Sequence, residues 1–202
     1  MNYEFDNSFK GFSLIAGVDE AGRGPLAGPV TAAAVILPPG LVIEGLDDSK
    51  KLSAKRREAL RDVIAREAVC WAVAHASVAE IEALNILNAA QLAMRRAIFQ
   101  LSPAPDLVLV DGNIARGFPV KAVPVVGGDG LSAGIAAASV LAKVTRDALM
   151  RELAETYPQY GFERHKGYGT ALHYERLRAH GPCPAHRMSF LRSLRLPVHS
   201  GQ

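Results

Sequence analysis

The stretch that organises this chain reads Ala16-Gly17-Val18-Asp19-Glu20-Ala21-Gly22-Arg23-Gly24-Pro25. The apolar run at 14–18 predicts a buried strand, and the glycines and proline after it predict a tight turn at which the backbone can come close to a ligand. Two adjacent carboxylates at the end of such a strand must be solvated, paired or bound to metal, because a buried unpaired carboxylate is costly to keep ionised. The stretch therefore predicts a strand that brings charge to the rim of a pocket.

Strand-like runs and helical patterns continue outward from this stretch. Four further strands are expected, over 28–37, 69–77, 107–112 and 120–126. Helices are expected from an N-cap at Ser53 to about residue 68, over 78–101 and over 133–157. A hairpin followed by strands that alternate with helices favours an α/β fold with a mixed five-stranded sheet flanked by helices. Pro158 ends the last long helix, which predicts a core over 1–156 and a helical C-terminal extension over 157–202, and the basic residues of the extension are the reason to expect that it contributes to substrate binding.

Composition narrows the class of protein. A chain of 202 residues with 49% hydrophobic content can bury the core of one domain with an appendage. Cys70 and Cys183 lie far apart and do not suggest a disulfide framework, which fits a reducing compartment. There is no run long enough to span a bilayer, and the N-terminus lacks the order of a signal peptide. We therefore expect a cytoplasmic monomer with no membrane partner.

The distribution of charge is more informative than the net charge of +3. From Arg164 to Arg195 the only acid is Glu175, and the basic residues counted there are Arg164, Lys166, Arg176, Arg178, Arg187, Arg192 and Arg195. A second basic cluster spans 50–57. Runs of this kind are usually solvated faces. Combined with an acidic site, they favour a polyanionic partner.

Four acids share one setting near the ends of predicted strands: Asp19, Glu20, Asp111 and Asp129. Neighbouring strands would bring them together, and oxygen-only ligands suit Mg²⁺ or Mn²⁺. Two such ions about 4 Å apart can activate a water and stabilise the leaving oxygen of a phosphodiester. An Asp-Gly pair alone is more often a turn signal, but the four acids together predict a metal-dependent nuclease.

Other motifs give weaker signals. The glycines after Glu20 have the wrong spacing for a dinucleotide fingerprint. His180, Cys183 and His186 have no fourth ligand nearby and are interpreted as structural. Tyr168 lies between two glycines close to basic residues, so a core tyrosine and one that stacks on sugars or bases are equally consistent with the sequence.

Several blocks of sequence follow one another in a distinctive order: Gly17 to Leu26, Asp48 to Ser53, Asp111 to Asn113, Ala137 to Ser139 with Ala142 to Asp147, and Tyr160 to Phe162 with His165 to Tyr168. In this order they resemble bacterial ribonuclease HII, the type 2 ribonuclease H. The resemblance implies an RNase H-like fold with a helical C-terminal extension. It also implies endonucleolytic cleavage of the RNA strand in RNA/DNA hybrids and on the 5′ side of single ribonucleotides embedded in duplex DNA. The products would carry a 3′-hydroxyl and a 5′-phosphate.

The resemblance also assigns roles to residues. The catalytic and metal-binding acids of the family fall on the four already singled out, with two Mg²⁺ or Mn²⁺ ions expected. The backbone of Gly22, Arg23 and Gly24 would recognise the 2′-hydroxyl of the ribonucleotide. Tyr168 would stack on the adjacent deoxyribose. The phosphate contacts would be Lys50, Lys143 and Arg146. The chain departs from the family at Gly130 and Ala136, where the family usually has serines. Two hydroxyl groups are therefore missing near Asp129.

Two other classes of function stay open. One is a different metal-dependent nuclease, such as a junction resolvase or a DNA-specific endonuclease, which would cut all-DNA substrates. The other is a non-catalytic nucleic-acid-binding module, which would not need converging carboxylates. The tail over 197–202 offers no clear clamp-binding peptide.

Overall fold

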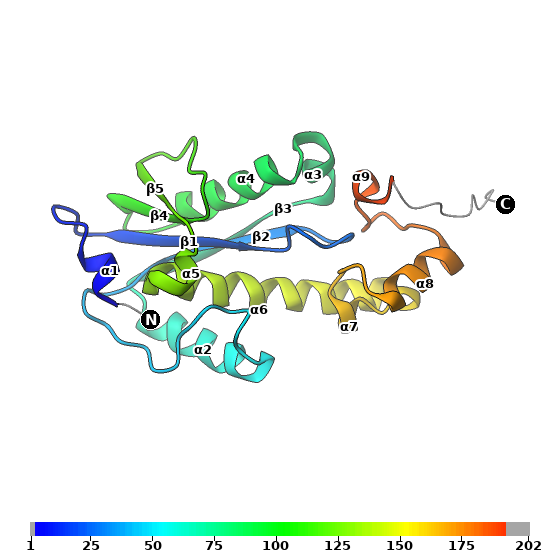
Figure 1. Ribbon diagram of the computed structural model, residues 1–202, viewed down its shortest axis with the longest axis horizontal. Helices are drawn as coiled ribbons and strands as arrows, with labels where there is room; N and C mark the ends of the chain where they lie inside the picture. Colours follow the sequence, from blue (N-terminus) through cyan, green and yellow to red (C-terminus); the bar gives the residue numbers. More distant parts are fainter. Residues whose placement is uncertain (1–2, 193–202) are drawn as a thin grey trace.

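A five-stranded mixed sheet forms the centre of the protein in the computed structural model, which describes residues 3–192 (Figure 1). The strands are β1 (Ile15–Ala21), β2 (Val30–Ile36), β3 (Cys70–Ala76), β4 (Leu107–Asp111) and β5 (Lys121–Val125), in the spatial order β3-β2-β1-β4-β5. The β1–β2 and β2–β3 pairs are antiparallel, whereas β1–β4 and β4–β5 are parallel. The predicted hairpin and mixed five-stranded sheet are confirmed.

The described helices are α1 (Tyr3–Asn7), α2 (Ala54–Glu67), α3 (Val78–Leu84), α4 (Ile86–Phe99), α5 (Gly128–Leu131), α6 (Ala133–Thr156), α7 (Phe162–His165), α8 (Ala171–His180) and α9 (Met188–Leu191), with a 3₁₀ turn at Pro158–Tyr160. Ser53 caps α2 as predicted, because its hydroxyl accepts a hydrogen bond from the Arg56 N–H. The single helix expected over 78–101 is wrong. Asn85 has a φ of +67°, which interrupts the helix, and its side chain caps α4 by accepting from the Asn88 N–H.

Helices cover both faces of the sheet. In Figure 1, α3 and α4 lie on one side, while α6 runs along the other with α2 outside it. Val18 packs in the core cluster on the α4 side, whereas Gly17 faces α6. A Cβ atom on Gly17 would lie only 2.0 Å from the carbonyl carbon of Gly134, so β1 and the first turn of α6 are in direct backbone contact. This contact fixes the start of α6 beneath β1.

The segment after α6 builds a second, smaller core at the far end of that helix (Figure 1). Tyr160, Phe162 and Leu177 are buried there against Leu26 and Ala27 from the connection between β1 and β2. The described part of the predicted extension therefore packs directly on the stretch that follows the first two acids. The predicted tail over 197–202 lies outside the described residues. Within residues 3–192, no helix has the length and apolar character needed to cross a membrane.

Candidate active site

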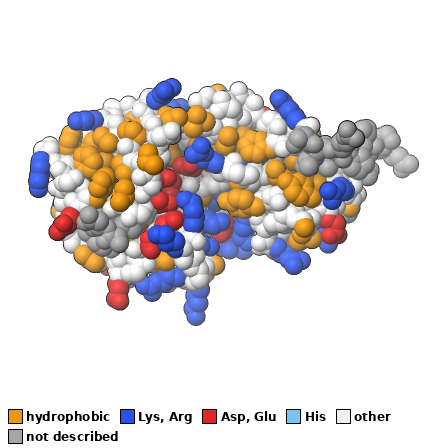
Figure 2. Space-filling view, in the orientation of Figure 1, with side chains coloured by type: hydrophobic (Ala, Val, Ile, Leu, Met, Phe, Trp, Pro, Cys, Tyr) orange, Lys and Arg blue, Asp and Glu red, His pale blue; other side chains and the backbone are white. Residues whose placement is uncertain are grey.

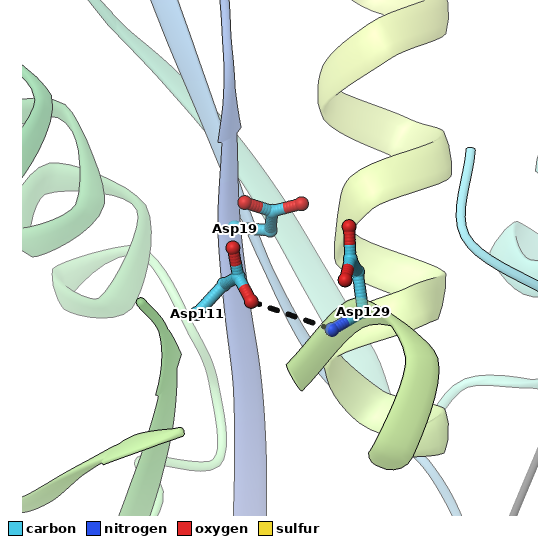
Figure 3. Close-up of side chains that lie close together, drawn as sticks. All are labelled: Asp19, Asp111 and Asp129. Atoms are coloured by element: carbon cyan, nitrogen blue, oxygen red, sulfur yellow. Dashed lines mark hydrogen bonds between the residues drawn. The ribbon is translucent and has the colours of Figure 1, made fainter. Parts of the chain in front are cut away.

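Three of the predicted acids converge at one edge of the sheet. Val18 of β1 is opposite Val110 of β4 in a parallel pair, so the next residues, Asp19 and Asp111, reach the same edge. Asp129 approaches from α5, directly before α6 (Figure 3). One carboxylate oxygen from each of the three lies within 4.8 Å of the others, and this is the only cluster of three potential metal ligands found in the described part of the chain.

Two local expectations need correction. Asp19 and Glu20 lie within β1 and not after it, because the strand continues through Ala21 in register with β2. Asp129 belongs to the short helix α5 rather than to a glycine loop. β1 is longer than expected because its pairing with β2 continues through Ala21, and the glycine segment forms a helical turn because the Ser132 N–H donates to the Gly128 carbonyl at 2.8 Å.

The three carboxylates repel one another, and two of them, Asp19 and Asp129, belong to buried residues. Asp19 is only 5% exposed, and burial, followed by the charges of Glu20 and Asp111, raises its pKa well above the usual range. Burial and the charge of Asp129 also raise the pKa of Asp111, although its Oδ1 accepts a 2.8 Å hydrogen bond from the Gly128 N–H. The Asp129 N–H donates to the same oxygen over 3.4 Å (Figure 3). A hard cation would relieve this repulsion, and the all-oxygen donor set fits Mg²⁺ or Mn²⁺.

Glu20 lies beside the three aspartates rather than among them. Successive strand residues point to opposite faces, so Glu20 leaves β1 on the face opposite to Asp19. Its Oε1 accepts a hydrogen bond from Arg23 Nη1 at 3.2 Å. Burial raises the pKa of Glu20, the Arg23 guanidinium lowers it, and the charge of Asp111 raises it again. The fourth acid thus joins the cluster electrostatically and connects it to the turn that follows.

Lys50 brings a positive charge to the same place. Its Nζ lies 2.9 Å from Oδ2 of Asp129, and this hydrogen bond is the main cause that raises the pKa of Lys50. The side chain is 77% exposed, so the ammonium stays open to solvent. In the space-filling view, acidic side chains gather midway along the molecule with basic side chains directly beside them (Figure 2). The predicted phosphate contact at Lys50 therefore borders the aspartates.

Three of the predicted substrate-binding residues, Gly24, Tyr168 and Lys143, form a second group at the turn that follows Glu20. Tyr168 is 43% exposed, and a Cβ atom on Gly24 would lie 3.9 Å from its ring. Lys143 Nζ lies 5.8 Å from the centroid of that ring and is paired with Asp147 at 2.7 Å. The turn, the tyrosine and one basic residue are thus brought together.

Arg146 occupies a different setting from the one expected. It is fully buried, and its guanidinium donates to the carbonyls of Ala27, Pro29 and Lys166 at 3.0–3.1 Å. Gly22, with a φ of +101°, packs directly against it, and a Cβ there would lie 2.0 Å from Arg146 Nε. With no exposed surface to offer a phosphate, Arg146 supports the connection between β1 and β2 from beneath.

Sequence reasoning missed Arg187, which it counted in a basic surface run. The side chain is fully buried under the same turn and donates to several of its carbonyls. No sequence signal distinguishes Arg187 from its exposed neighbours. Its partners are backbone carbonyls, so the sequence contains no paired acidic residue that would indicate a buried arginine.

The histidines near the C-terminal end are structural, as interpreted. His186 and His173 are buried with their Nε2 atoms 3.0 Å apart, and His186 Nδ1 lies 3.2 Å from Cys183 Sγ. His180 is exposed and does not join them. Burial lowers the pKa of His173 and of His186 to about 4, so both rings are neutral at pH 7.

Comparison with known proteins gives one consistent result. The family model described as Ribonuclease HII matches residues 16–193. A protein named Ribonuclease HII from Delftia acidovorans is 60% identical over 177 residues, which cover 88% of this chain and 75% of that protein. A crystal structure of the ribonuclease H2 from Pyrococcus horikoshii has a TM-score of 0.72 at 24% identity and covers 88% of this chain and 93% of its own. The structure of a PCNA:RNase HII complex from Archaeoglobus fulgidus has the same TM-score at 25% identity, over 92% of this chain and 98% of its own.

Proposed function

This chain belongs to the ribonuclease HII family, and on that premise we propose the reaction that its site carries out. The protein is a metal-dependent endoribonuclease with an RNase H-like fold. We infer that it cleaves the RNA strand of RNA/DNA hybrids and also cuts duplex DNA on the 5′ side of a single embedded ribonucleotide. The products are a 3′-hydroxyl and a 5′-phosphate.

One observation carries the proposal: the acidic cluster and the Gly22–Gly24 turn are joined through a hydrogen bond. Arg23 of the turn donates to Glu20 at 3.2 Å, and Glu20 follows the buried Asp19 directly in β1. A group that recognises a ribose and a group that cleaves its neighbouring phosphate must lie within one nucleotide of each other. This spacing supports recognition and cleavage in a single site.

Asp19, Asp111 and Asp129 would hold the metal, with Glu20 as a further ligand to a second ion. Divalent ions supply, when bound, an activated water and charge stabilisation for the leaving oxygen. The chain's own residues then position the substrate. Lys50 is exposed at the edge of the aspartates, where its ammonium can contact a phosphate, and Tyr168 offers an exposed ring beside Gly24 for a sugar.

The test compares three duplexes that differ only in sugar: all-DNA, DNA with one ribonucleotide, and an RNA/DNA hybrid. With Mg²⁺ or Mn²⁺, we expect cleavage of the hybrid, a single nick 5′ of the lone ribonucleotide, and an intact all-DNA duplex. No nick with either metal would overturn the proposal. Cleavage of all-DNA would favour a resolvase-like nuclease, and tight binding in EDTA without cleavage under any condition would favour a binding module.

We further propose that the enzyme acts as a cytoplasmic monomer. Cys70 and Cys183 are both free thiols, which is the usual state in a reducing compartment. Light scattering of the purified protein tests the oligomeric state, and a molar mass of twice the 21.6 kDa chain would overturn a monomer. Titration with each metal separately would decide between Mg²⁺ and Mn²⁺.

A further inference from the structure

Arg187 holds the connection between β1 and β2 from inside. Its guanidinium donates five hydrogen bonds to four carbonyls of this one connection. The acceptors are Gly22 at 2.6 Å, Arg23 at 2.9 Å, Pro25 at 2.8 Å, and Gly28 at 2.8 and 2.9 Å. The Arg187 N–H also donates to the Leu26 carbonyl at 2.8 Å. Every carbonyl bound in this way points toward the guanidinium and away from solvent.

These inward carbonyls determine where the following N–H groups point. In a trans peptide the C=O and the next N–H point in opposite directions, and the only cis bond in the described chain is Ser102–Pro103. The carbonyl of Gly22 therefore turns the N–H of Arg23 outward, and the carbonyl of Arg23 turns the N–H of Gly24 outward. The carbonyl of Pro25 directs the N–H of Leu26 away from the guanidinium as well, but this N–H donates to the carbonyl of buried Gly167 at 2.8 Å and is not free. Gly28 precedes a proline, which has no N–H.

Two outward donors are left without a partner. Neither the Arg23 N–H nor the Gly24 N–H donates to any residue between 3 and 192, and both residues are exposed. Gly22 and Pro25 on either side of them are buried. Adjacent backbone donors that are free and face solvent beside Glu20 are suited to bind an oxygen atom of a ligand.

The charge of Arg187 indicates that this arrangement has a function. No carboxylate in the described chain lies within 4.0 Å of its guanidinium, and burial, followed by the nearby charge of Arg146, lowers its pKa to about 9. A buried cation without an acid is a costly way to stabilise a turn, because an uncharged residue would avoid the desolvation penalty. The planar guanidinium has several N–H donors in fixed directions, so it can orient several carbonyls at once, which an apolar residue cannot do.

We propose that Arg187 is a positioning residue for sugar selection: by holding the Gly22 and Arg23 carbonyls inward, it presents the Arg23 and Gly24 N–H groups to a ribose hydroxyl. The inference rests on the proposed function, since it assumes that a ribonucleotide is bound at this turn. Arg187 does not touch the substrate. It acts through the backbone of the turn, with Arg146 as a second support on the Ala27 and Pro29 carbonyls.

The experiment replaces the guanidinium of Arg187 with a charged group in one variant and with a neutral group in another. Arg187→Lys retains the cation but cannot bind carbonyls in several fixed directions. Arg187→Gln removes the charge and keeps two N–H donors. Arg66→Lys, on the exposed end of α2, is the matched control. For each protein, thermal unfolding is measured first. The dissociation constants for a duplex with one ribonucleotide and for the identical all-DNA duplex are then measured in EDTA, so that neither is cut.

We expect wild-type and Arg66→Lys to bind the ribonucleotide duplex more tightly than all-DNA. In a folded Arg187 variant this preference should fall about tenfold, since one well-placed hydrogen bond is worth roughly that factor. All-DNA affinity should stay within about twofold. A folded variant with an unchanged preference would overturn the proposal, and so would failure of both variants to fold, because Arg187 would then be a stability element. Failure of the proposed function is a separate result, seen as the absence of any ribonucleotide-dependent nick by wild-type protein.

Discussion

The ammonium of Lys50 lies 2.9 Å from Oδ2 of Asp129, at the open side of three carboxylates that repel one another. It is the only cation within 4.0 Å of these aspartates among the ion pairs of the described residues. In metal-free protein, Lys50 therefore partly neutralises the cluster.

Lys50→Gln should lower the metal-free melting temperature and increase the gain in melting temperature on adding Mg²⁺. Since the side chain is 77% exposed, the effect is small, about 1–3 °C. Lys51→Gln is the control, because Lys51 pairs with Asp47 and not with the cluster. Thermal unfolding in EDTA and in Mg²⁺ measures both quantities. An equal Mg²⁺ response in the two variants would show that Lys50 does not neutralise the site.

Asp19→Asn should abolish cleavage and stabilise the metal-free protein. The substitution removes a proposed metal ligand, for which we expect a loss of roughly a thousandfold or more in the cleavage rate. It also removes a buried charge that burial, Glu20 and Asp111 all disfavour, so the free energy of unfolding in EDTA should rise by about 1–2 kcal/mol. A nicking assay and urea unfolding measure the two effects. Asp62→Asn, on the surface of α2, should change neither, and retained cleavage by Asp19→Asn would remove Asp19 from the catalytic set.

The buried pair His173 and His186 should make the protein lose stability in acid. Both pKa values are about 4 in the folded state, below the ordinary 6.5, so the unfolded chain takes up protons first as the pH falls. Above pH 6.5 the two histidines do not lower the free energy of unfolding. Between pH 6.5 and pH 4 the free energy of unfolding falls by up to about 1.4 kcal/mol per histidine per pH unit. His165 stacks on His173, and Cys183 contacts His186, so these groups complete the titrating cluster.

The measurement is the free energy of unfolding by urea between pH 7.5 and pH 5. The raised pKa values of Asp19 and Asp111 act in the opposite direction, so the informative quantity is the difference between wild-type and a histidine variant. His186→Asn should give a shallower fall in stability than wild-type. His180→Asn, at an exposed position, should reproduce the wild-type slope. Identical slopes for wild-type and His186→Asn would contradict the assignment.

Gly17→Ala should destabilise the fold severely. The added methyl would lie 2.0 Å from the Gly134 carbonyl carbon and 2.2 Å from the Ile135 nitrogen, and neither backbone can yield without moving β1 or α6. We expect a loss of about 3 kcal/mol or more in urea unfolding. Gly130→Ala is the matched control, since no atom lies within 4 Å of the Cβ it would add. A loss below that of the control would mean that the strand and helix are not in contact there.

Much of this architecture could be predicted from local pattern. Runs dominated by apolar residues identified all five strands, although β5 is only partly buried, and Ser53 marked a helix start through its capping chemistry. The sequence predicted that four acids would meet because each lies near the end of an apolar run, and the structure brings three of them, Asp19, Asp111 and Asp129, within reach of one ion. The break between α3 and α4 at Asn85 was not predicted. The apolar spacing continues through this position, so it gives no sign of the positive φ of Asn85 or of the cap that its side chain forms.

The supports of the turn could not be predicted at all. Arg146 and Arg187 lie in segments whose composition is typical of exposed basic faces, and their partners are backbone carbonyls, which every residue has. Only the tertiary structure distinguishes them from Lys143, which pairs with an acid near the surface. Basic residues near an acidic site can therefore either contact the substrate or donate hydrogen bonds to backbone carbonyls, and the burial of the side chain distinguishes the two roles.

Gly22 and Arg187 stand 165 positions apart, yet a single hydrogen bond joins them. During synthesis the three aspartates are all present once residue 129 has been translated, whereas the guanidinium beneath the turn arrives several seconds later at typical ribosome speeds. A growing chain therefore contains all three aspartates before it contains the residue that orients the turn. A premature stop between these points would yield a protein that contains the three aspartates but lacks the guanidinium beneath the turn, so the order of translation makes the turn the last part of the candidate site to be completed.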